Sequence, residues 1–313
     1  VSPETAIAIG KLGGLGVLNL EGLWTRYDDP RIPLGEIASM PDKHATRRMQ
    51  EIYAAPIRPE LIKERIKQIR DSGVTVAASL SPQRTAQLHK AVIDAGVDIF
   101  VIRGTTVSAE HVAAENEALN LKKFIYELDV PVIVGGVATT TGALHLMRAG
   151  AAGVLVGFGG GAAHTTQTVL GIQVPMATAV ADVAAARREY LDESGGRYVH
   201  VIADGSVGKS GDIAKAIACG ADAVMMGSAL AKAAESPGLG WHWGSEAYHA
   251  DVPRGQRVNV GTVGTLEEVL NGPSHTSDGS MNLFGALRRA MATCGYSDVK
   301  SFQRVEIIMQ HGR

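Results

Sequence analysis

One pattern of apolar and polar positions recurs along the chain. A segment with the apolar periodicity of an amphipathic helix ends in Gly, and a short run rich in Val, Ile or Met follows at once. Gly supplies the left-handed residue that ends a helix, and a short, uniformly apolar run fits a strand buried on both faces. The clearest of these helix, Gly, strand units are LIKERIKQIRDSGVTVAASL, AQLHKAVIDAGVDIFVIRG, TTGALHLMRAGAAGVLVGFG and GDIAKAIACGADAVMMGS.

The number and order of these units predict the fold. With GLGVLNL, VPVIVGG and YVHVIADG the chain has seven expected strands, near residues 15, 75, 98, 131, 153, 199 and 222. Strands alternating with helices at this spacing predict a parallel sheet, and so many similar units favour a closed barrel over an open sheet. The predicted fold is an α/β protein, a (β/α)8 TIM barrel forming a single domain over residues 1–313.

The first residues have the features of a helix start. Ser2 can cap a helix, Pro3 suits its first position, and Glu4 favours the positive end of its dipole. A barrel of this kind begins with a strand, and Val1 is not an initiator Met. We therefore expect the first strand to be missing from the N-terminus of this chain, which an intact mass equal to the 313 residues alone would contradict.

Two long insertions interrupt the alternation. Residues 21–60 follow the first visible strand, and residues 235–280 separate the last strand from a final helix near MNLFGALRRAMATCG. Both follow the C-terminal end of a strand, where the active sites of such barrels lie. The insertions are therefore either lids over a site or variable surface loops.

Composition and charge exclude several classes of function. A formal net charge of -2 gives no basic surface for nucleic acid or an anionic membrane. No apolar run is long enough to span a bilayer, and the first residues carry no secretion signal. Cys219 and Cys294 are too few for a disulfide framework and have no metal-ligand spacing, so we interpret both as structural thiols. We expect a cytoplasmic protein without a metal site.

Two neighbouring strand ends carry a candidate phosphate site. VIADGSVGKSGD places Asp204, Gly205 and Ser206 at one strand end, and MMGSAL places Gly227 and Ser228 at the next. The loops after the last two strands of such a barrel commonly bind phosphate through backbone N–H groups and a helix N-terminus. Turn glycines with a helix-capping Asp are the alternative, but the occurrence of both loops at this pair of strands favours phosphate.

A glycine-rich loop, GFGGGAAHTTQ at residues 157–167, follows the preceding strand on the same face. It contains Gly160, Gly161 and His164, and an imidazole can act as a general acid or base near neutral pH. A flexible turn that exposes a His to solvent would explain the loop equally well.

The segment ADGSVGKSGDIAKAIACGADAVMMGSALA, preceded by GFGGGAAHTTQTVLGIQVPMATAVADVAAA, resembles the IMP dehydrogenase and GMP reductase family. The likeness runs from PETAIAIGKLGGLGV to GALRRAMATCGY and is greatest to the short bacterial members, since residues 21–60 are too short for a pair of regulatory CBS domains. It implies an NAD- or NADP-dependent oxidoreductase that converts IMP to XMP or GMP to IMP. It also implies a homotetramer.

The resemblance assigns roles to the candidate residues. It implies that Asp204 holds the ribose hydroxyls of a purine ribonucleoside 5'-monophosphate, while the glycines and serines bind its phosphate; these are Gly160, Gly161, Gly205, Ser206, Gly227 and Ser228. Where the family has G-P-G-S-x-C-T-T, this chain has GGGAAHTT, so His164 replaces the catalytic Cys. Thr166 matches a Thr that helps to activate water or ammonia, although it can equally be a loop hydroxyl bonded to backbone.

Loss of the Cys changes the expected chemistry. The family's thiolate adds to purine C2, and imidazole is a poorer group for that covalent step. His164 would instead polarise a group or act as a general base. Two hypotheses remain: an oxidoreductase with altered catalytic groups, and a catalytically impaired nucleotide-binding protein on the same barrel.

Further departures from the family surround the site. Arg103 stands where the family has a cofactor-contacting Asp, and Gly136 stands where it has an Asn. The flap segment PRGQRVNVGTVGT holds Arg254 and Arg257 without the adjacent Tyr, since Tyr248 lies in AYH. Trp241 and Trp243, on either side of His242, either stack on a base or cofactor or anchor a subunit contact. The sequence does not identify the cofactor-binding residues.

Overall fold

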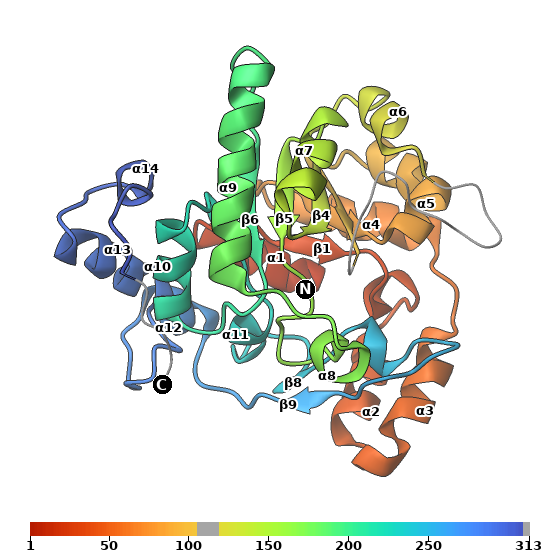
Figure 1. Cartoon of the computed structure of the whole chain (residues 1–313). Helices are drawn as coiled ribbons and strands as arrows, with labels where there is room; N and C mark the ends of the chain where they lie inside the picture. The colour runs from red at the N-terminus through yellow and green to blue at the C-terminus, as the bar shows by residue number, and fades with distance from the viewer. Residues whose placement is uncertain (105–118, 309–313) are drawn as a thin grey trace.

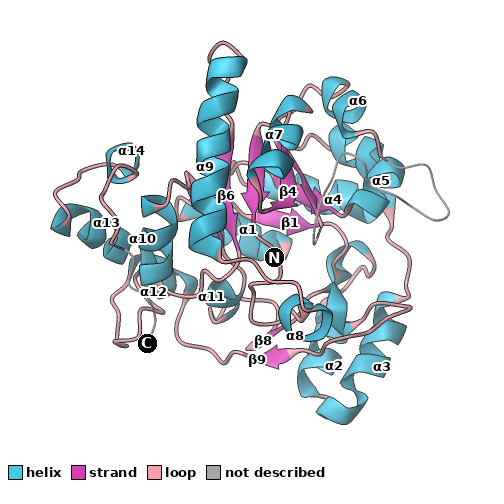
Figure 2. Cartoon of the chain, viewed as in Figure 1, coloured by secondary structure: helices cyan, strands magenta, loops and turns pink. Residues whose placement is uncertain are grey.

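A computed structural model of the chain describes residues 1–104 and 119–308. Seven strands form one curled, parallel sheet in chain order, the wall of an α/β barrel, with helices covering its outer face (Figure 1; Figure 2). The strands are β1 (Val17–Asn19), β2 (Ala77–Leu80), β3 (Ile99–Arg103), β4 (Val132–Val137), β5 (Gly153–Val156), β6 (His200–Asp204) and β7 (Ala223–Met225). The predicted fold class and strand positions are confirmed. The strand expected before residue 1 stays a prediction.

The helices begin and end where the sequence signals place them. Ser2 accepts a hydrogen bond from the Thr5 N–H at the start of the first helix, as expected. The helices outside the insertions are α1 (Pro3–Lys11), α4 (Pro59–Asp71), α5 (Pro82–Asp94), α6 (Leu121–Tyr126), α7 (Thr140–Arg148), α8 (Thr166–Leu170), α9 (Met176–Glu193), α10 (Ser210–Ala218), α11 (Ser228–Ala231), α13 (Leu283–Thr293) and α14 (Val299–Phe302). Gly73, Gly96, Gly150 and Gly220 have φ values of 79°, 84°, 108° and 109°, which confirms their role in ending helices. The helix expected to be last, α13, is followed by α14.

The main core lies between the sheet and its helices. All residues of β5 are buried, which agrees with its unbroken apolar sequence GVLV. The largest fully buried side chain is Phe100 of β3, and it meets Phe124 of α6 edge to face with ring centroids 5.8 Å apart. Among the described residues, no helix has the length and apolar character needed to cross a membrane.

Both insertions contain regular structure that the sequence pattern did not reveal. The first forms η1 (Leu23–Thr25), α2 (Arg31–Ser39) and α3 (Asp42–Tyr53). The second forms η2 (Ser245–Ala247), α12 (Leu266–Asn271) and an antiparallel hairpin of β8 (Trp241–His242) and β9 (Val258–Asn259). In α3 the buried residues Ala45, Met49 and Ile52 do have helical spacing, but long charged residues between them dilute the signal.

The two insertions pack on each other to form a second, small core. Leu23, Ile37 and Met49 of the first insertion lie in one cluster with Ala247 of the second. The Tyr53 and Tyr248 rings stack with centroids 3.5 Å apart, and the Trp243 indole N–H donates to the Tyr53 hydroxyl at 2.9 Å. The insertions are therefore one packed unit rather than independent surface loops. Trp243 is partly buried against this core, and its expected contact with a base, a cofactor or a second subunit stays a prediction.

Candidate functional site

The glycine-rich loop after β5 packs directly against the loop after β6. The Ser206 N–H donates to the Gly160 carbonyl at 3.1 Å, and a Cβ on Gly160 would lie only 2.7 Å from both the backbone N and the Oγ of Ser206. A Cβ on Gly157 would lie 2.8 Å from the Asp204 carbonyl oxygen. Glycine is needed at both positions because two backbones meet there. The structure thus brings the two predicted loops together.

The turn after β7 lies beside them and offers free backbone donors. Met225 is opposite Asp204 in the sheet register, so Gly227 and Ser228 follow on the neighbouring strand. No described residue accepts a hydrogen bond from the N–H of Gly227 or Ser228. The start of α10 is different: Gly208 and Lys209 donate to Asp212, and Ser210 donates to the Gly279 carbonyl. The β7–α11 turn therefore offers backbone donors to an anion, whereas several N–H groups at the start of α10 already have acceptors.

Asp204 pairs with Arg103 across the end of the sheet. Nε of Arg103 lies 2.9 Å from Oδ2 of Asp204, and a second guanidinium nitrogen lies 3.3 Å from Oδ1. Asp204 is 9% exposed, and its charge raises the pKa of Arg103. A ligand hydroxyl that approached this carboxylate would share it with the guanidinium. One sequence departure from the family, Arg103, therefore pairs with Asp204, a residue that matches the family.

The imidazole of His164 is engaged on both of its edges. The Gly161 N–H donates to its Nδ1 at 3.1 Å, and its Nε2 lies 3.9 Å from Oε1 of Glu246. A neutral ring whose Nδ1 accepts a hydrogen bond carries its proton on Nε2. In this arrangement His164 has no free nitrogen lone pair to offer as a nucleophile or base.

Glu246, which the sequence reasoning missed, is the buried carboxylate of the site. It lies in η2, is 4% exposed, and has a guanidinium nitrogen of Arg254 3.8 Å from its Oε1. The Arg254 N–H also donates to the Glu246 carbonyl at 3.0 Å. A single 3-10 turn has no periodicity that marks one face as buried, so no sequence pattern singled this residue out.

The two flap arginines have different roles. Arg257 is 4% exposed and donates to the carbonyls of Ile37 and Met40, at the end of α2. Its guanidinium also lies 3.9 Å from the centre of the Trp241 ring. Arg257 therefore joins the two insertions, and Arg254 is the flap arginine at the site.

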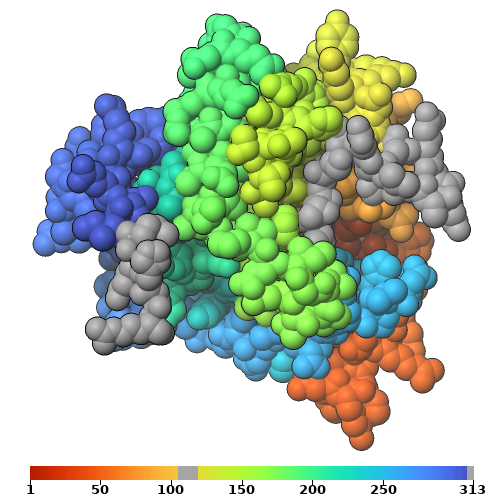
Figure 3. Space-filling model, viewed as in Figure 1, coloured from red at the N-terminus to blue at the C-terminus, as the bar shows by residue number. Residues whose placement is uncertain are grey.

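Two threonine hydroxyls and a second histidine lie near His164. The Oγ1 atoms of Thr165 and Thr166 are buried and have no hydrogen-bond partner among the described residues. A Cβ on Gly255 would lie 3.1 Å from Cγ2 of Thr165, so the flap touches the loop, and in Figure 3 the segments carrying them adjoin. Burial, followed by the nearby His164, lowers the pKa of His242 to about 4, so His242 is neutral at physiological pH.

The cysteines lie outside this cluster. Cys219 caps the end of α10 and is half-buried rather than fully buried, and burial raises the pKa of its thiol. Cys294 caps the end of α13 and is exposed. Neither is positioned to replace the missing loop thiol.

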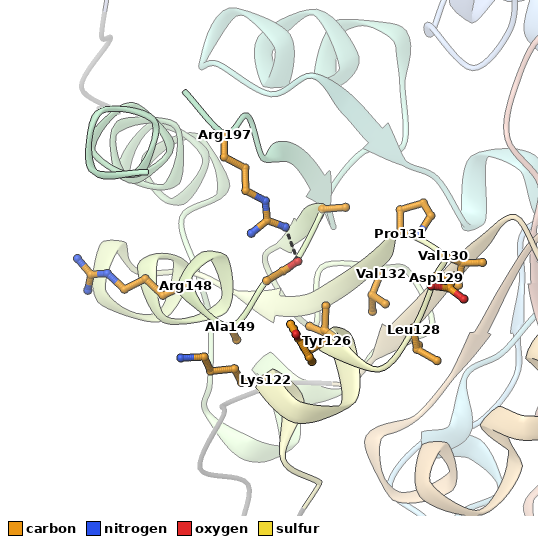
Figure 4. Close-up of a pocket in the computed structure, with 13 residues that line it drawn as sticks. Lys122, Tyr126, Leu128, Asp129, Val130, Pro131, Val132, Arg148, Ala149 and Arg197 are labelled. Atoms are coloured by element: carbon orange, nitrogen blue, oxygen red, sulfur yellow. Dashed lines mark hydrogen bonds between the residues drawn. The ribbon is translucent and has the colours of Figure 1, made fainter. Parts of the chain in front are cut away.

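A cavity of about 560 Å³ lies at the opposite end of the sheet, where β4 and β5 begin (Figure 4). Its lining includes Pro131, Arg148 and Arg197. Arg148 pairs with Glu193 at 2.6 Å, and Arg197 donates to the Gly150 carbonyl, so both arginines of the lining already have partners within the chain. None of the predicted site residues lines this cavity.

Comparison with known proteins places the chain in a family. Residues 2–257 match the IMP dehydrogenase / GMP reductase domain. An uncharacterized oxidoreductase of Mycolicibacterium smegmatis is 54% identical over 97% of this chain and 84% of its own length. The inosine-5'-monophosphate dehydrogenase of Methanocaldococcus jannaschii is 34% identical over 73% of this chain and 49% of its own length.

A solved structure agrees with this placement. The crystal structure of an IMP dehydrogenase/GMP reductase-like protein from Corynebacterium glutamicum superposes with a TM-score of 0.91 at 52% identity, covering 98% of this chain and 81% of that one. Sequence and fold therefore agree over almost the whole chain. The chain belongs to the IMP dehydrogenase / GMP reductase family of oxidoreductases.

Proposed function

We propose that the chain binds a purine ribonucleoside 5'-monophosphate at the C-terminal ends of β5, β6 and β7 and acts on it as an oxidoreductase of the IMP dehydrogenase or GMP reductase type. The observation that carries the proposal is the meeting of the Gly160, Ser206 and Gly227 loops beside His164. The 5'-phosphate would take the free N–H groups of Gly227 and Ser228, with hydroxyls from Ser206 and Ser228. Asp204 would accept from the ribose while still paired with Arg103.

The base would lie against His164, where the family has a Cys. Nε2 of His164 lies 3.9 Å from Glu246, beyond hydrogen-bond distance, so its N–H would remain able to donate to the purine, whereas a covalent adduct would require the ring to break its bond with Gly161. Thr166 is buried at the loop end, and its hydroxyl, which has no partner among the described residues, could bind water or ammonia. We therefore assign His164 a polarising role rather than a nucleophilic one.

A nicotinamide cofactor, NAD or NADP, would accept or supply the hydride of such a reaction. The residues present do not fit the cofactor contact that the resemblance implies, because Arg103 stands at that position and already pairs with Asp204. The family resemblance also supports a cytoplasmic homotetramer as part of this proposal.

Binding without turnover is the second candidate, and it is favoured because the Gly161 N–H occupies the Nδ1 lone pair of His164, which leaves the neutral ring no lone pair for attack on the purine. The test is calorimetric titration with IMP, XMP and GMP, together with absorbance of NADH and NADPH during incubation with each nucleotide. Turnover that His164→Ala abolishes and the exposed control His44→Ala retains would support the oxidoreductase and exclude the binding-only function. Binding with no redox change would select the second candidate. Absence of binding would overturn both.

A further inference from the structure

A buried carboxylate faces His164 from a distant part of the chain. Oε1 of Glu246 lies 3.9 Å from Nε2 of His164 and 3.8 Å from Arg254, close enough for charge attraction but longer than a hydrogen bond. No described residue donates a hydrogen bond to this carboxylate. A buried carboxylate in such a place depends on the opposite charges and dipoles next to it.

The other edge of the ring is fixed by its own loop. Because the Gly161 N–H donates to Nδ1, the proton of the neutral ring lies on Nε2, directed toward Glu246. We propose that Glu246 is a positioning residue, which holds the imidazole of His164 in its Nε2–H tautomer and in one orientation at the end of β5. The proposal rests on the proposed function only in placing His164 beside the nucleotide.

Glu246 precedes the flap in sequence and is joined to it by a hydrogen bond. The Arg254 N–H donates to the Glu246 carbonyl at 3.0 Å, and the next residue, Gly255, touches Thr165 of the His164 loop. The Arg254 guanidinium lies 3.8 Å from Oε1 of Glu246 and so places a second charge beside the carboxylate. The carboxylate therefore comes from η2, which is bonded to the flap, and the imidazole comes from the glycine-rich loop.

The test is nuclear magnetic resonance of the free protein labelled with ¹⁵N-histidine. The His164 signals are identified by their loss in His164→Gln. In the native protein we expect a pyrrole-like Nε2 and a pyridine-like Nδ1. Glu246→Gln keeps the shape but removes the charge, and should shift the tautomer ratio roughly tenfold toward Nδ1–H. Glu246→Asp should retain the native ratio, as should the exposed control Glu267→Gln.

A folded Glu246→Gln protein with unchanged His164 signals would overturn the proposal. If that variant does not fold, Arg254→Gln is the second test: it keeps the carboxylate, so the native tautomer should persist, and mixed tautomers there would overturn the proposal. No nucleotide is present in these measurements. A tautomer shift in a protein that binds no nucleotide would therefore refute the proposed function and leave the role of Glu246 supported.

Discussion

Both ends of the sheet hold a buried carboxylate among cations, and the two are held very differently. At the N-terminal end of β7, Asp222 accepts from Arg187 at 2.7 Å, from the Val201 N–H at 2.9 Å and from the Tyr198 hydroxyl at 2.7 Å. At the C-terminal end, the carboxylate of Glu246 accepts no hydrogen bond from a described residue. A carboxylate that accepts several hydrogen bonds from the protein stabilises the fold. A carboxylate that can still accept hydrogen bonds is suited to act in a functional site.

The pKa of Asp222 is set by the hydrogen bonds that its carboxylate accepts. Burial by itself raises the pKa of this group, but hydrogen bonds from Lys300, Val201, Tyr198 and Gln303 outweigh burial and lower the pKa to about 2. The network also joins α14 to the barrel, because Lys300 and Gln303 lie in or next to that helix. The N-terminal end of the barrel is thus the end that secures the chain.

Asp222→Ala should have the largest effect. It removes several hydrogen bonds and leaves the buried guanidinium of Arg187 unpaired, so we expect a loss of about 3–5 kcal/mol in the free energy of unfolding, measured by urea denaturation. The control is Asp29→Ala, which breaks an exposed pair with Arg31 and should leave the urea midpoint nearly unchanged. Equal losses in the two variants would remove the basis of the comparison.

Gly160→Ala should harm the site and spare the fold. Its Cβ would lie 2.7 Å from Ser206 and would push the two loops apart, so we expect nucleotide affinity to fall at least about tenfold, or about 1.4 kcal/mol, in calorimetric titration. Gly208→Ala is the matched control, because a Cβ there meets nothing within 4 Å and the φ of Gly208 is not in the left-handed region. If Gly160→Ala bound the nucleotide normally, the loop contact would not belong to the site.

The contrast between the two ends also shows what the sequence could predict. The barrel follows from short local signals: an apolar strand, an amphipathic helix and a glycine such as Gly73 or Gly220 that must adopt a positive φ. The loops at Asp204 and Gly227 could be placed together because the ends of parallel strands converge on one face.

Contacts between segments that are distant in the chain could not be predicted from the sequence. Arg103 and Asp204 stand on strands that are not neighbours in the sheet, and nothing local to either residue marks the other as its partner. Glu246 comes from a single turn whose position depends on the small core shared by the two insertions. Such pairings are set by tertiary packing, which no single-sequence period records.

Acid should weaken the N-terminal end in a defined range of pH. A carboxylate whose pKa is lower in the folded state stabilises the fold above its unfolded pKa, and that contribution is lost as the pH falls through the folded value. For Asp222 the range runs from 3.8 down to about 2. Lys300 and Tyr198 are exposed, so solvent screens the interactions of this network. We therefore expect about 1 kcal/mol of acid-dependent stability that Asp222→Asn lacks. Unfolding curves of the two proteins with the same pH dependence over this range would contradict the assignment.

Glu246→Gln should have the smallest effect on stability. Because its carboxylate accepts no hydrogen bond from a described residue, the substitution removes only charge attraction over 3.8–3.9 Å to partly exposed partners. We expect the free energy of unfolding to change by less than about 1 kcal/mol, measured by the same urea denaturation. A loss as large as that of Asp222→Ala would show that Glu246 is a structural group with undetected partners. A small change together with an altered His164 tautomer would show that this carboxylate serves the site.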